Sequence, residues 1–471
     1  MAIDSQAVLD RVEAEKETYL EELKDYLRIP SISTDPDYDG DVSRCCDFLL
    51  ERMREAGLEA ERIATDRHPL AYAEWTGAEG KPTVLFYGHY DVQPPDPLEL
   101  WRHPPFEPTI EGDELVARGA TDDKGQSYTH VKAIGAMLAE RGELPVNVKF
   151  LVEGEEESGG ESIDAFVRED GGDKLACDCV VVSDTAMYAP GQPSMLYGLK
   201  GLAYMEIEVT GPDRDLHSGT FGGAVANPAN GLAHIIAGLT DPRSGRCLVP
   251  GFYDDVLPLT DEERERFAAL PFVEAEYAEA IGVAEVFGEE GYTTLERAWG
   301  RPTCDVNGIW GGYQGKGAKT VLPAKAGAKV SMRLVPHQDP EKIARAFEER
   351  VRSVTPPGLT VDVRYIHGGP AVLIDTESPL VAAALAAQAH AWGARRCRIG
   401  GGATVARPYL IREGGSIPIV GTFNEVLGKP VILMGFGLSD DRLHSPNEKF
   451  NVSHFYNGIR TVVRLLDRLG N

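Results

Sequence analysis

The stretch PTVLFYGHYD, residues 82–91, decides the class of the fold. It opens with an apolar run that is typical of a buried strand and ends in His89 and Asp91. Two later runs, VNVKFLV at 146–152 and CVVV at 179–182, repeat this pattern, and acidic residues follow each of them. Because helical patterns separate the runs, the sequence predicts an α/β domain with a mainly parallel sheet.

A second pattern begins near residue 200. Segments at 203–210, 326–335 and 359–366 alternate apolar and polar residues, as half-exposed strands do. Helical spacing appears between them at 228–238 and 339–354. This order predicts an antiparallel sheet with helices on one face.

The order of the two patterns predicts two domains. The α/β pattern returns after residue 369 and ends in a helix at 452–469. We therefore expect one α/β domain built from residues 1–201 and 369–471, interrupted by a smaller α+β domain at 202–368. The charged segment 250–300 is predicted to be a helical insertion. Further helices are expected at 7–28, 41–56, 126–141 and 162–169.

The composition argues against several classes of function. A chain of 471 residues is too long for one ordinary hydrophobic core. Its 47 basic and 74 acidic side chains give a formal net charge of −27. This acidity argues against nucleic acid and anionic lipid as partners. The N-terminus does not read as a signal peptide, and no apolar run is long enough to span a bilayer, so a cytoplasmic protein without membrane contact is predicted. Seven cysteines without a CxxC pair indicate neither a disulfide framework nor a thiolate zinc site.

Histidine and acidic residues gather at the ends of the predicted elements. In a parallel sheet the carboxyl ends of the strands share one edge, so these clusters are expected to converge. Each cluster alone is weak evidence, because an acidic run is usually a solvated loop. Their combination in this order is much more specific. The clusters are Gly88-His89-Tyr90-Asp91, Thr121-Asp122-Asp123-Lys124-Gly125, Glu155-Glu156-Glu157-Ser158-Gly159, Ser183-Asp184 and His444.

Two histidines with several carboxylates and no cysteine form a ligand set that suits zinc, cobalt or manganese. Four carboxylates in one pocket, those of Asp122, Glu156, Glu157 and Asp184, would repel one another and raise their own pKa values. Two divalent ions would supply four positive charges. A pair of metal ions is a standard device for activating one water molecule. The sequence therefore predicts a two-metal hydrolytic site.

Further motifs extend this set: Asp215-Leu216-His217-Ser218-Gly219, Ser331-Met332-Arg333-Leu334-Val335-Pro336, Arg412-Glu413-Gly414-Gly415-Ser416-Ile417-Pro418 and His444-Ser445-Pro446-Asn447-Glu448. Together the motifs resemble the co-catalytic metallopeptidase family of carboxypeptidase G, aminoacylase and the dipeptidases. The cytosolic non-specific dipeptidase and carnosine dipeptidase branch is the most similar. The resemblance implies a catalytic domain of the zinc-peptidase type, interrupted by a lid and dimerisation domain.

The resemblance also implies a role for each site residue. It implies two divalent ions per chain. Zinc is the expected metal, with manganese or cobalt as alternatives. It implies a cis peptide bond between Asp122 and Asp123, which is rare outside proline. The implied roles are Asp122 bridging both metals, His89 and Asp184 completing one site, His444 and Glu157 completing the other, Glu156 as general base, and Asp91 holding the second ring nitrogen of His89.

Other implied residues lie in the inserted domain or near its end. His217 of a second subunit is expected to donate to the oxyanion, which makes a homodimer through the inserted domain the expected assembly. Arg333 is expected to clamp the terminal carboxylate of the substrate, because its planar fork suits that group. Thr320 and Ser416 are further candidates for substrate contact.

The predicted function is hydrolysis of dipeptides, or of short peptides at the C-terminal residue, by a metal-bridging water that Glu156 activates. One alternative keeps the site but changes the substrate to an N-acyl or N-carbamoyl amino acid. Another is an inactive metal-binding relative that serves as an interaction protein. The intact Glu156 and the full ligand set argue against the last of these.

Overall fold

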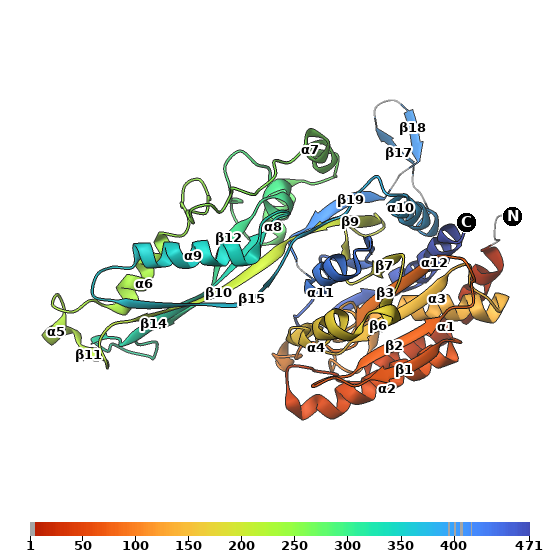
Figure 1. The fold of residues 1–471 in the computed structure, drawn as a ribbon, viewed down its shortest axis with the longest axis horizontal. Coiled ribbons are helices and arrows are strands. Elements are labelled where there is room, and N and C mark those ends of the chain that lie inside the picture. Colours follow the sequence, from red (N-terminus) through yellow and green to blue (C-terminus); the bar gives the residue numbers. More distant parts are fainter. Residues whose placement is uncertain (1–4, 394–395, 400–401, 406–407, 416) are drawn as a thin grey trace. The chain divides into compact units, whose positions relative to one another are not determined.

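The structure, a computed structural model, describes residues 5–393, 396–399, 402–405, 408–415 and 417–471. The chain forms two compact units (Figure 1). Unit 1 comprises Met1–Tyr197, Ile374–Ile411 and Thr422–Asn471, and unit 2 comprises Gly198–Leu373 and Arg412–Gly421. The segment Arg412–Gly421 thus groups with unit 2, although the sequence pattern assigned it to the first domain.

A twisted sheet forms the centre of unit 1, and its strand order is β1-β2-β6-β3-β7-β20-β9. The four middle strands are parallel, and the strands at both edges are antiparallel. The strands are β1 (Glu59–Ile63), β2 (Leu70–Trp75), β3 (Thr83–His89), β6 (Asn147–Glu153), β7 (Cys179–Val182), β9 (Ser194–Leu199) and β20 (Val431–Leu433). The mainly parallel arrangement predicted from the apolar runs is confirmed.

Helices cover both faces of this sheet because neighbouring residues of a buried strand point to opposite sides. Phe86 of β3 packs on His130 of α3 (Lys124–Arg141), and the next residue, Tyr87, packs on Phe423 in the short helical turn Phe423–Leu427. Helices α1 (Gln6–Leu27) and α12 (Val452–Leu469) pack against α3 on the same side. The remaining helices of unit 1 are α2 (Asp39–Glu55), α4 (Glu161–Ala165) and α10 (Pro379–Ala391).

Short strands complete unit 1. Strands β4 (Thr109–Glu111), β5 (Glu114–Val116) and β22 (Lys449–Asn451) form a small antiparallel sheet. Strands β8 (Ala186–Met187) and β21 (Gly437–Leu438) form a parallel pair, and β17 (Arg396–Ile399) pairs with β18 (Gly402–Val405). Strand β19 (Tyr409–Glu413) pairs with β9. Strand β16 (Val372–Leu373), which also pairs with β9, lies in unit 2, as does helix α11 (Pro418–Thr422) except for its last residue.

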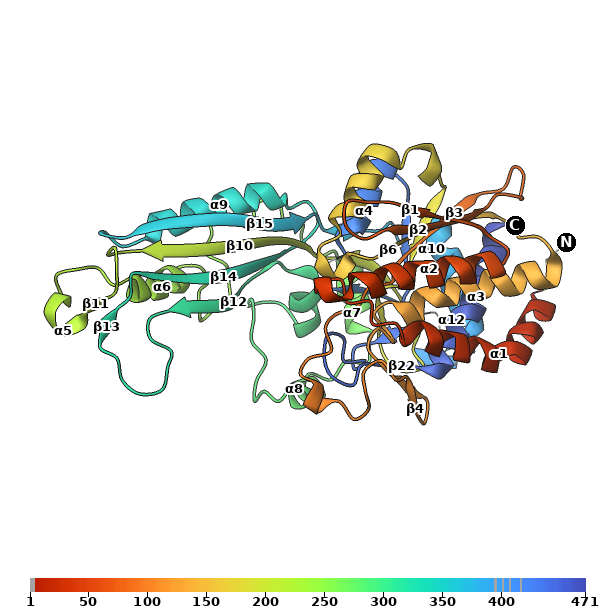
Figure 2. The same ribbon diagram turned by 90° about the horizontal axis from the view of Figure 1, so that it is seen from below.

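Unit 2 contains an antiparallel sheet of order β12-β14-β10-β15, visible in Figure 2. Its strands are β12 (Thr303–Gly311), β14 (Lys325–Leu334), β10 (Gly201–Thr210) and β15 (Thr360–Gly369). Alternate residues such as Ile207 and Ala328 face a core that includes residues of α6 (Pro228–Ala237) and α9 (Pro340–Val354). Helix α9 begins with Pro340 after the N-cap Asp339, whose side chain accepts the backbone N–H of Lys342. The predicted antiparallel sheet with helices on one face is confirmed.

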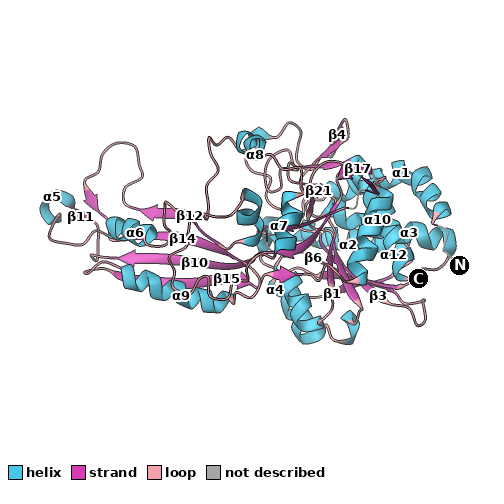
Figure 3. Cartoon of the chain, turned by 90° about the horizontal axis from the view of Figure 1, so that it is seen from above, coloured by secondary structure: helices cyan, strands magenta, loops and turns pink. Residues whose placement is uncertain are grey.

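The charged segment 250–300 is only partly helical, which corrects the prediction. Its α-helices are α7 (Asp261–Ala268) and α8 (Glu274–Ala280), and much of the remainder is loops and turns (Figure 3). Buried ion pairs stabilise this segment, among them Arg301 with Glu289 at 2.6 Å.

Unit 2 also contains a small pair of strands, β11 (Leu216–His217) and β13 (Val321–Leu322), which lies beside α5 (Ser218–Phe221).

Among the described helices, none combines the length and the apolar character that crossing a bilayer requires.

Candidate metal centre

All five predicted metal ligands lie in unit 1, at the ends of its secondary-structure elements. His89 is the last residue of β3, Asp122 lies two residues before α3, and Glu157 lies in the turn that follows β6. Asp184 follows β7 by two residues, and His444 lies in the loop between β21 and β22. The parallel strands β6, β3 and β7 are adjacent, so their carboxyl ends bring three of these side chains to one edge of the sheet.

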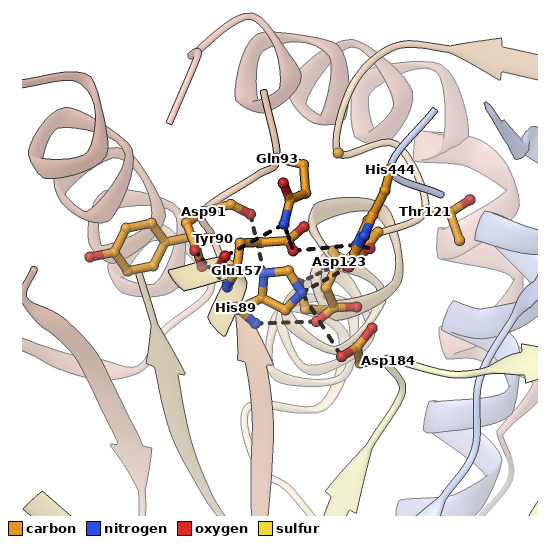
Figure 4. Close-up of polar contacts among 12 residues, drawn as sticks. His89, Tyr90, Asp91, Gln93, Thr121, Asp123, Glu157, Asp184 and His444 are labelled. Atoms are coloured by element: carbon orange, nitrogen blue, oxygen red, sulfur yellow. Dashed lines mark hydrogen bonds and ion pairs between the residues drawn. The ribbon is translucent and has the colours of Figure 1, made fainter. Parts of the chain in front are cut away.

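The carboxylate of Asp122 stands at the centre of two groups of ligand atoms. Its Oδ1 lies 3.0 Å from Nε2 of His89, whose Nε2 is also 3.9 Å from Oδ2 of Asp184. Its Oδ2 lies 3.0 Å from Nε2 of His444, which is 3.3 Å from Oε2 of Glu157. Each group of three ligand atoms falls within 4.8 Å. Figure 4 shows the side chains of His89, Asp184, Glu157 and His444, which point toward a common centre.

Neighbouring groups hold these ligands in place. Nδ1 of His89 lies 3.1 Å from the carbonyl oxygen of Asp91 and 3.3 Å from its Oδ1, so Nε2 is left to face the site. Oδ2 of Asp91 accepts hydrogen bonds from the Ser33 hydroxyl and from the backbone N–H of Glu157. Gln93 donates from Nε2 to Oε2 of Glu157 at 2.8 Å (Figure 4). The geometry thus places Asp91 where the prediction expected it.

The electrostatics of the site are those of crowded, buried carboxylates. Burial, followed by the nearby charge of Asp122, raises the pKa of Asp184 to about 6. Burial also raises the pKa values of Glu156 and Glu157 well above their usual range. For Asp122 burial acts in the same direction, but hydrogen bonds to His444 and His89 outweigh it and lower the pKa below the usual range.

Divalent cations fit this donor set. It offers imidazole nitrogen and carboxylate oxygen only, which are the ligands that zinc, manganese and cobalt share. Every raised carboxylate pKa reports negative charge that lacks compensation, and a cation among these oxygens would lower it. His89, Asp122 and Asp184 would hold one ion, and Asp122, Glu157 and His444 would hold another.

The peptide bond between Asp122 and Asp123 is cis, as the resemblance implied. Asp123 is buried, and its Oδ2 accepts the backbone N–H of His89 at 3.3 Å. The hydroxyl of Thr121 lies within hydrogen-bonding distance of Oδ2 of Asp441 and of the carbonyl of Lys449. Neither periodicity nor a motif assigned Gln93 or Asp441 to the site, because their contacts are tertiary, and Thr121 stood in a predicted cluster without a role of its own.

Unit 2 contains the other predicted residues that the structure describes. His217 is exposed on β11, and its Nδ1 accepts the backbone N–H of Gly219 at 3.0 Å. Thr320 is exposed next to it, and its carbonyl accepts the N–H of Ser218 at 3.1 Å. Arg333 is partly buried near the opposite end of β14. Ser416 lies outside the described residues. Within unit 2, therefore, His217 and Thr320 lie together, and Arg333 does not lie with them.

Peptidase family M20/M25/M40 matches residues 85–468 of the chain. The Cys-Gly metallodipeptidase DUG1 of Candida albicans is 33% identical, and the alignment covers 97% of this chain and 96% of that protein. The human Beta-Ala-His dipeptidase is 31% identical, with coverage of 96% and 90%. Among solved structures, the metallo-carboxypeptidase Sso-CP2 from Sulfolobus solfataricus has a TM-score of 0.85 at 33% identity, covering 96% of this chain and 99% of its own.

Proposed function

The chain belongs to peptidase family M20/M25/M40, and from that premise we propose that it hydrolyses dipeptides at a centre of two divalent metal ions. The observation that carries the proposal is the carboxylate of Asp122, whose two oxygens face two separate groups of ligand atoms. Such sharing is the arrangement that two cooperating ions require. Zinc is the proposed metal, with manganese or cobalt as alternatives.

When bound, the ions would make a water molecule more acidic and would polarise the scissile carbonyl group. The chain itself supplies the proton transfer. We assign Glu156 as the general base that takes the proton of the attacking water and passes it to the leaving amine. Glu156 is partly buried beside the ligand Glu157, and burial raises its pKa above the usual range of a carboxyl group. Asp91 keeps His89 oriented through its second ring nitrogen.

Arg333 is the proposed partner of the free carboxylate of the substrate. Its guanidinium group is partly buried on the polar face of the unit 2 sheet, the face opposite the helices. Desolvation strengthens a charge-assisted hydrogen bond, so such an arginine suits a carboxylate that a dipeptide always carries. Thr320 and Ser416 are proposed as further substrate contacts, Thr320 at the site of a second copy because it lies beside His217.

The spacing within unit 2 supports a homodimer. Strand β14 separates Arg333 from the β11–β13 pair, because β13 lies just before the other end of β14. The eight residue steps of strand from Lys325 to Arg333 span about 27 Å, which is far longer than a dipeptide. His217 and Arg333 of one copy therefore cannot both touch one dipeptide. We propose that His217 serves the site of a second copy, where it donates to the oxyanion.

We further propose a cytoplasmic location. Six cysteines, all except Cys397, are free thiols, and five of these six are buried. Unpaired thiols are typical of a reducing compartment.

A second activity, release of the C-terminal residue from longer peptides, is supported by the likeness to a metallo-carboxypeptidase. The two activities differ in whether the site accepts a chain beyond two residues. N-acyl and N-carbamoyl amino acids remain the alternative substrates of the same metal centre.

The test is metal analysis followed by assays of the metal-free and the zinc-, cobalt- or manganese-restored protein. The panel contains Cys-Gly, β-Ala-His, other dipeptides, tri- and tetrapeptides, and N-acetyl amino acids. Two ions per chain with cleavage confined to dipeptides supports the first proposal. Cleavage of longer peptides from the C-terminus supports the second. A protein that takes up no metal and cleaves no substrate in the panel contradicts both.

A further inference from the structure

Glu448 is a buried carboxylate with an unusual number of donors around it. Its Oε2 accepts hydrogen bonds from Nη1 of Arg118 at 2.7 Å and from the backbone N–H of Gly119 at 2.9 Å. Its Oε1 accepts the N–H groups of Thr121 at 3.0 Å and of Asp122 at 3.1 Å. One side chain therefore holds three backbone groups of the loop that carries the shared ligand Asp122.

The loop that carries His444 also has a constrained backbone. Arg442, His444 and Asn447 have φ angles of 59°, 57° and 64°, a region that residues other than glycine seldom adopt. Conformations of this kind persist where the surroundings impose them. The side chain of Asn447 supplies part of that constraint, because its Oδ1 accepts the N–H of Arg102 and its Nδ2 donates to the carbonyl of Leu100. Glu448, the next residue, supplies a further part through its four hydrogen bonds.

These contacts connect two ligands that are far apart in the sequence. Asp122 and His444 are 322 residues apart, yet their side chains lie 3.0 Å from each other. Glu448 follows His444 by four residues and binds the backbone N–H of Asp122 itself. It is thus a direct link between the two loops.

We propose that Glu448 is a positioning residue of the metal centre: its carboxylate sets the Asp122 loop against the His444 loop, so that both ligands reach the same ion. The inference rests on the proposed two-metal function and adds a residue to it. Glu448 touches neither substrate nor metal in this scheme, and it acts through the backbone of the Asp122 loop.

The chemistry of four donors makes a carboxylate the suitable group. Both oxygens of an ionised Glu accept only, so four N–H groups can be satisfied at once. In Glu448→Gln one oxygen becomes an NH₂ group, which would face two N–H donors of Arg118 and Gly119, or of Thr121 and Asp122. In Glu448→Asp the charge remains, but the side chain is one carbon shorter and reaches fewer of these donors.

The experiment compares wild type, Glu448→Gln and Glu448→Asp with Asp440→Asn as the matched control. Asp440 is an exposed acid in the same loop, so its replacement removes one negative charge and none of the contacts above. Metal-free full-length proteins are titrated with Co²⁺, and visible absorption reports both affinity and ligand geometry. Thermal unfolding of the metal-free proteins, and kcat and KM on a dipeptide at saturating Co²⁺, are measured alongside.

For Glu448→Gln we expect Co²⁺ affinity to fall at least tenfold, with an altered absorption spectrum. We expect kcat to fall tenfold or more and KM to change less than threefold, because substrate contacts are untouched. Glu448→Asp should show a smaller loss, of at least threefold in affinity, and Asp440→Asn should stay within twofold of wild type.

A folded Glu448→Gln protein with wild-type Co²⁺ affinity and spectrum would overturn the inference. If that variant does not fold, Glu448→Asp decides, and a loss of less than threefold in its affinity overturns the inference. The wild-type protein distinguishes failure of the proposed two-metal function from failure of the proposed role of Glu448. If wild type binds no Co²⁺ and cleaves no dipeptide, the two-metal function fails and the role of Glu448 fails with it. If wild type binds and cleaves while Glu448→Gln behaves like the control, only the role of Glu448 fails.

Discussion

The two units of the chain differ in the burial and the hydrogen bonding of their predicted site residues. In unit 1, His89, Asp91 and Asp122 are buried, and each is held by hydrogen bonds from neighbouring segments. In unit 2, His217 and Thr320 are exposed, and Arg333 lies near the other end of β14, about 27 Å along the strand from Lys325. Unit 1 therefore assembles a site by itself, whereas unit 2 carries separate donors that need another surface to work on.

This difference assigns separate tasks to the units. Preorganised ligands cost no rearrangement at the moment of reaction, so we assign the proposed chemical step to unit 1. We assign to the donors on the sheet and hairpin of unit 2 the proposed recognition of the ends and the oxyanion of a substrate. Substitutions in unit 1 should thus lower kcat, and substitutions in unit 2 should lower kcat/KM or depend on a second copy of the chain.

The largest effect is expected within the three consecutive glutamates of unit 1. Glu156→Gln should lower kcat about 1,000-fold, because it removes the general base. Its metal content should equal that of wild type, since Glu156 belongs to neither group of ligand atoms. The measurement is kcat on a dipeptide together with metal analysis of the same sample.

The neighbours of Glu156 provide the controls. Glu157→Gln should lose metal, because Glu157 belongs to one ligand group. Glu155→Gln should keep both metal and most of kcat, and should only lower the melting temperature, since Glu155 binds the N–H of His68 and the hydroxyl of Ser162. If Glu155→Gln loses turnover and Glu156→Gln keeps it, the base is assigned one residue too late.

The next prediction tests whether His217 of unit 2 acts at the metal site of a second copy of the chain. His217→Ala should lower kcat/KM about 100-fold, the order expected for loss of one oxyanion donor. A mixture of His217→Ala and Glu156→Gln chains should regain activity after joint refolding or co-expression. In mixed dimers the His217→Ala copy keeps Glu156 and receives His217 from its partner. If the mixture is no more active than either variant alone, His217 does not act at the site of a second copy.

Much of unit 1 could be predicted because its signals are local. Each of the apolar runs at 82–87, 146–152 and 179–182 is one buried strand, and the ligands follow directly after them. The links that hold the ligands could not be predicted, because they join distant segments. Glu448 stands in the quoted HSPNE motif, yet its role depends on backbone groups more than 300 residues earlier.

Unit 2 was harder to predict for other physical reasons. Strand β12 was missed because a register shift between Val306 and Gly308 interrupts its alternation. The segment 250–300 has the charge of an exposed helix, but glycines with positive φ at 282, 288 and 291 end any long helix there. Its helix α7 has a clear local signal, a capping box between Thr260 and Glu263, and this signal was available in the sequence.

A smaller effect concerns recognition by Arg333. Arg333→Met should lower kcat/KM on dipeptides about 10- to 100-fold, the range for loss of a charged hydrogen bond. The same variant should lose little on the corresponding C-terminal amides, because an amide offers no carboxylate. Lys329→Met is the matched control, since Lys329 lies four residues earlier on the same face of β14 and is exposed. Equal losses on acids and amides would contradict a carboxylate contact.

The smallest effect concerns a buried lysine of unit 2. Lys200 is 4% exposed and donates to the carbonyl of Arg297 at 3.2 Å. Burial is the main cause that lowers its pKa to about 7; the charge of Asp305 opposes this effect, and Arg333 and Arg301 add to it. Between pH 7 and pH 10 the unfolded chain keeps this proton and the folded chain does not. Since the unfolded state binds more protons, stability from this group rises with pH across that window.

Lys200→Met removes the titrating amine, so it should remove this rise. The difference in unfolding free energy between wild type and variant should change by about 1.4 kcal/mol per pH unit from pH 7 upward, in favour of wild type. Urea unfolding at pH 7, 8 and 9 measures it, with Lys329→Met as an exposed control that should run parallel to wild type. Parallel curves for wild type and Lys200→Met would mean that Lys200 stays charged in the fold. Unit 2 would then contain a buried charge, as unit 1 contains buried carboxylates. The two units would differ only in where their hydrogen-bond donors lie.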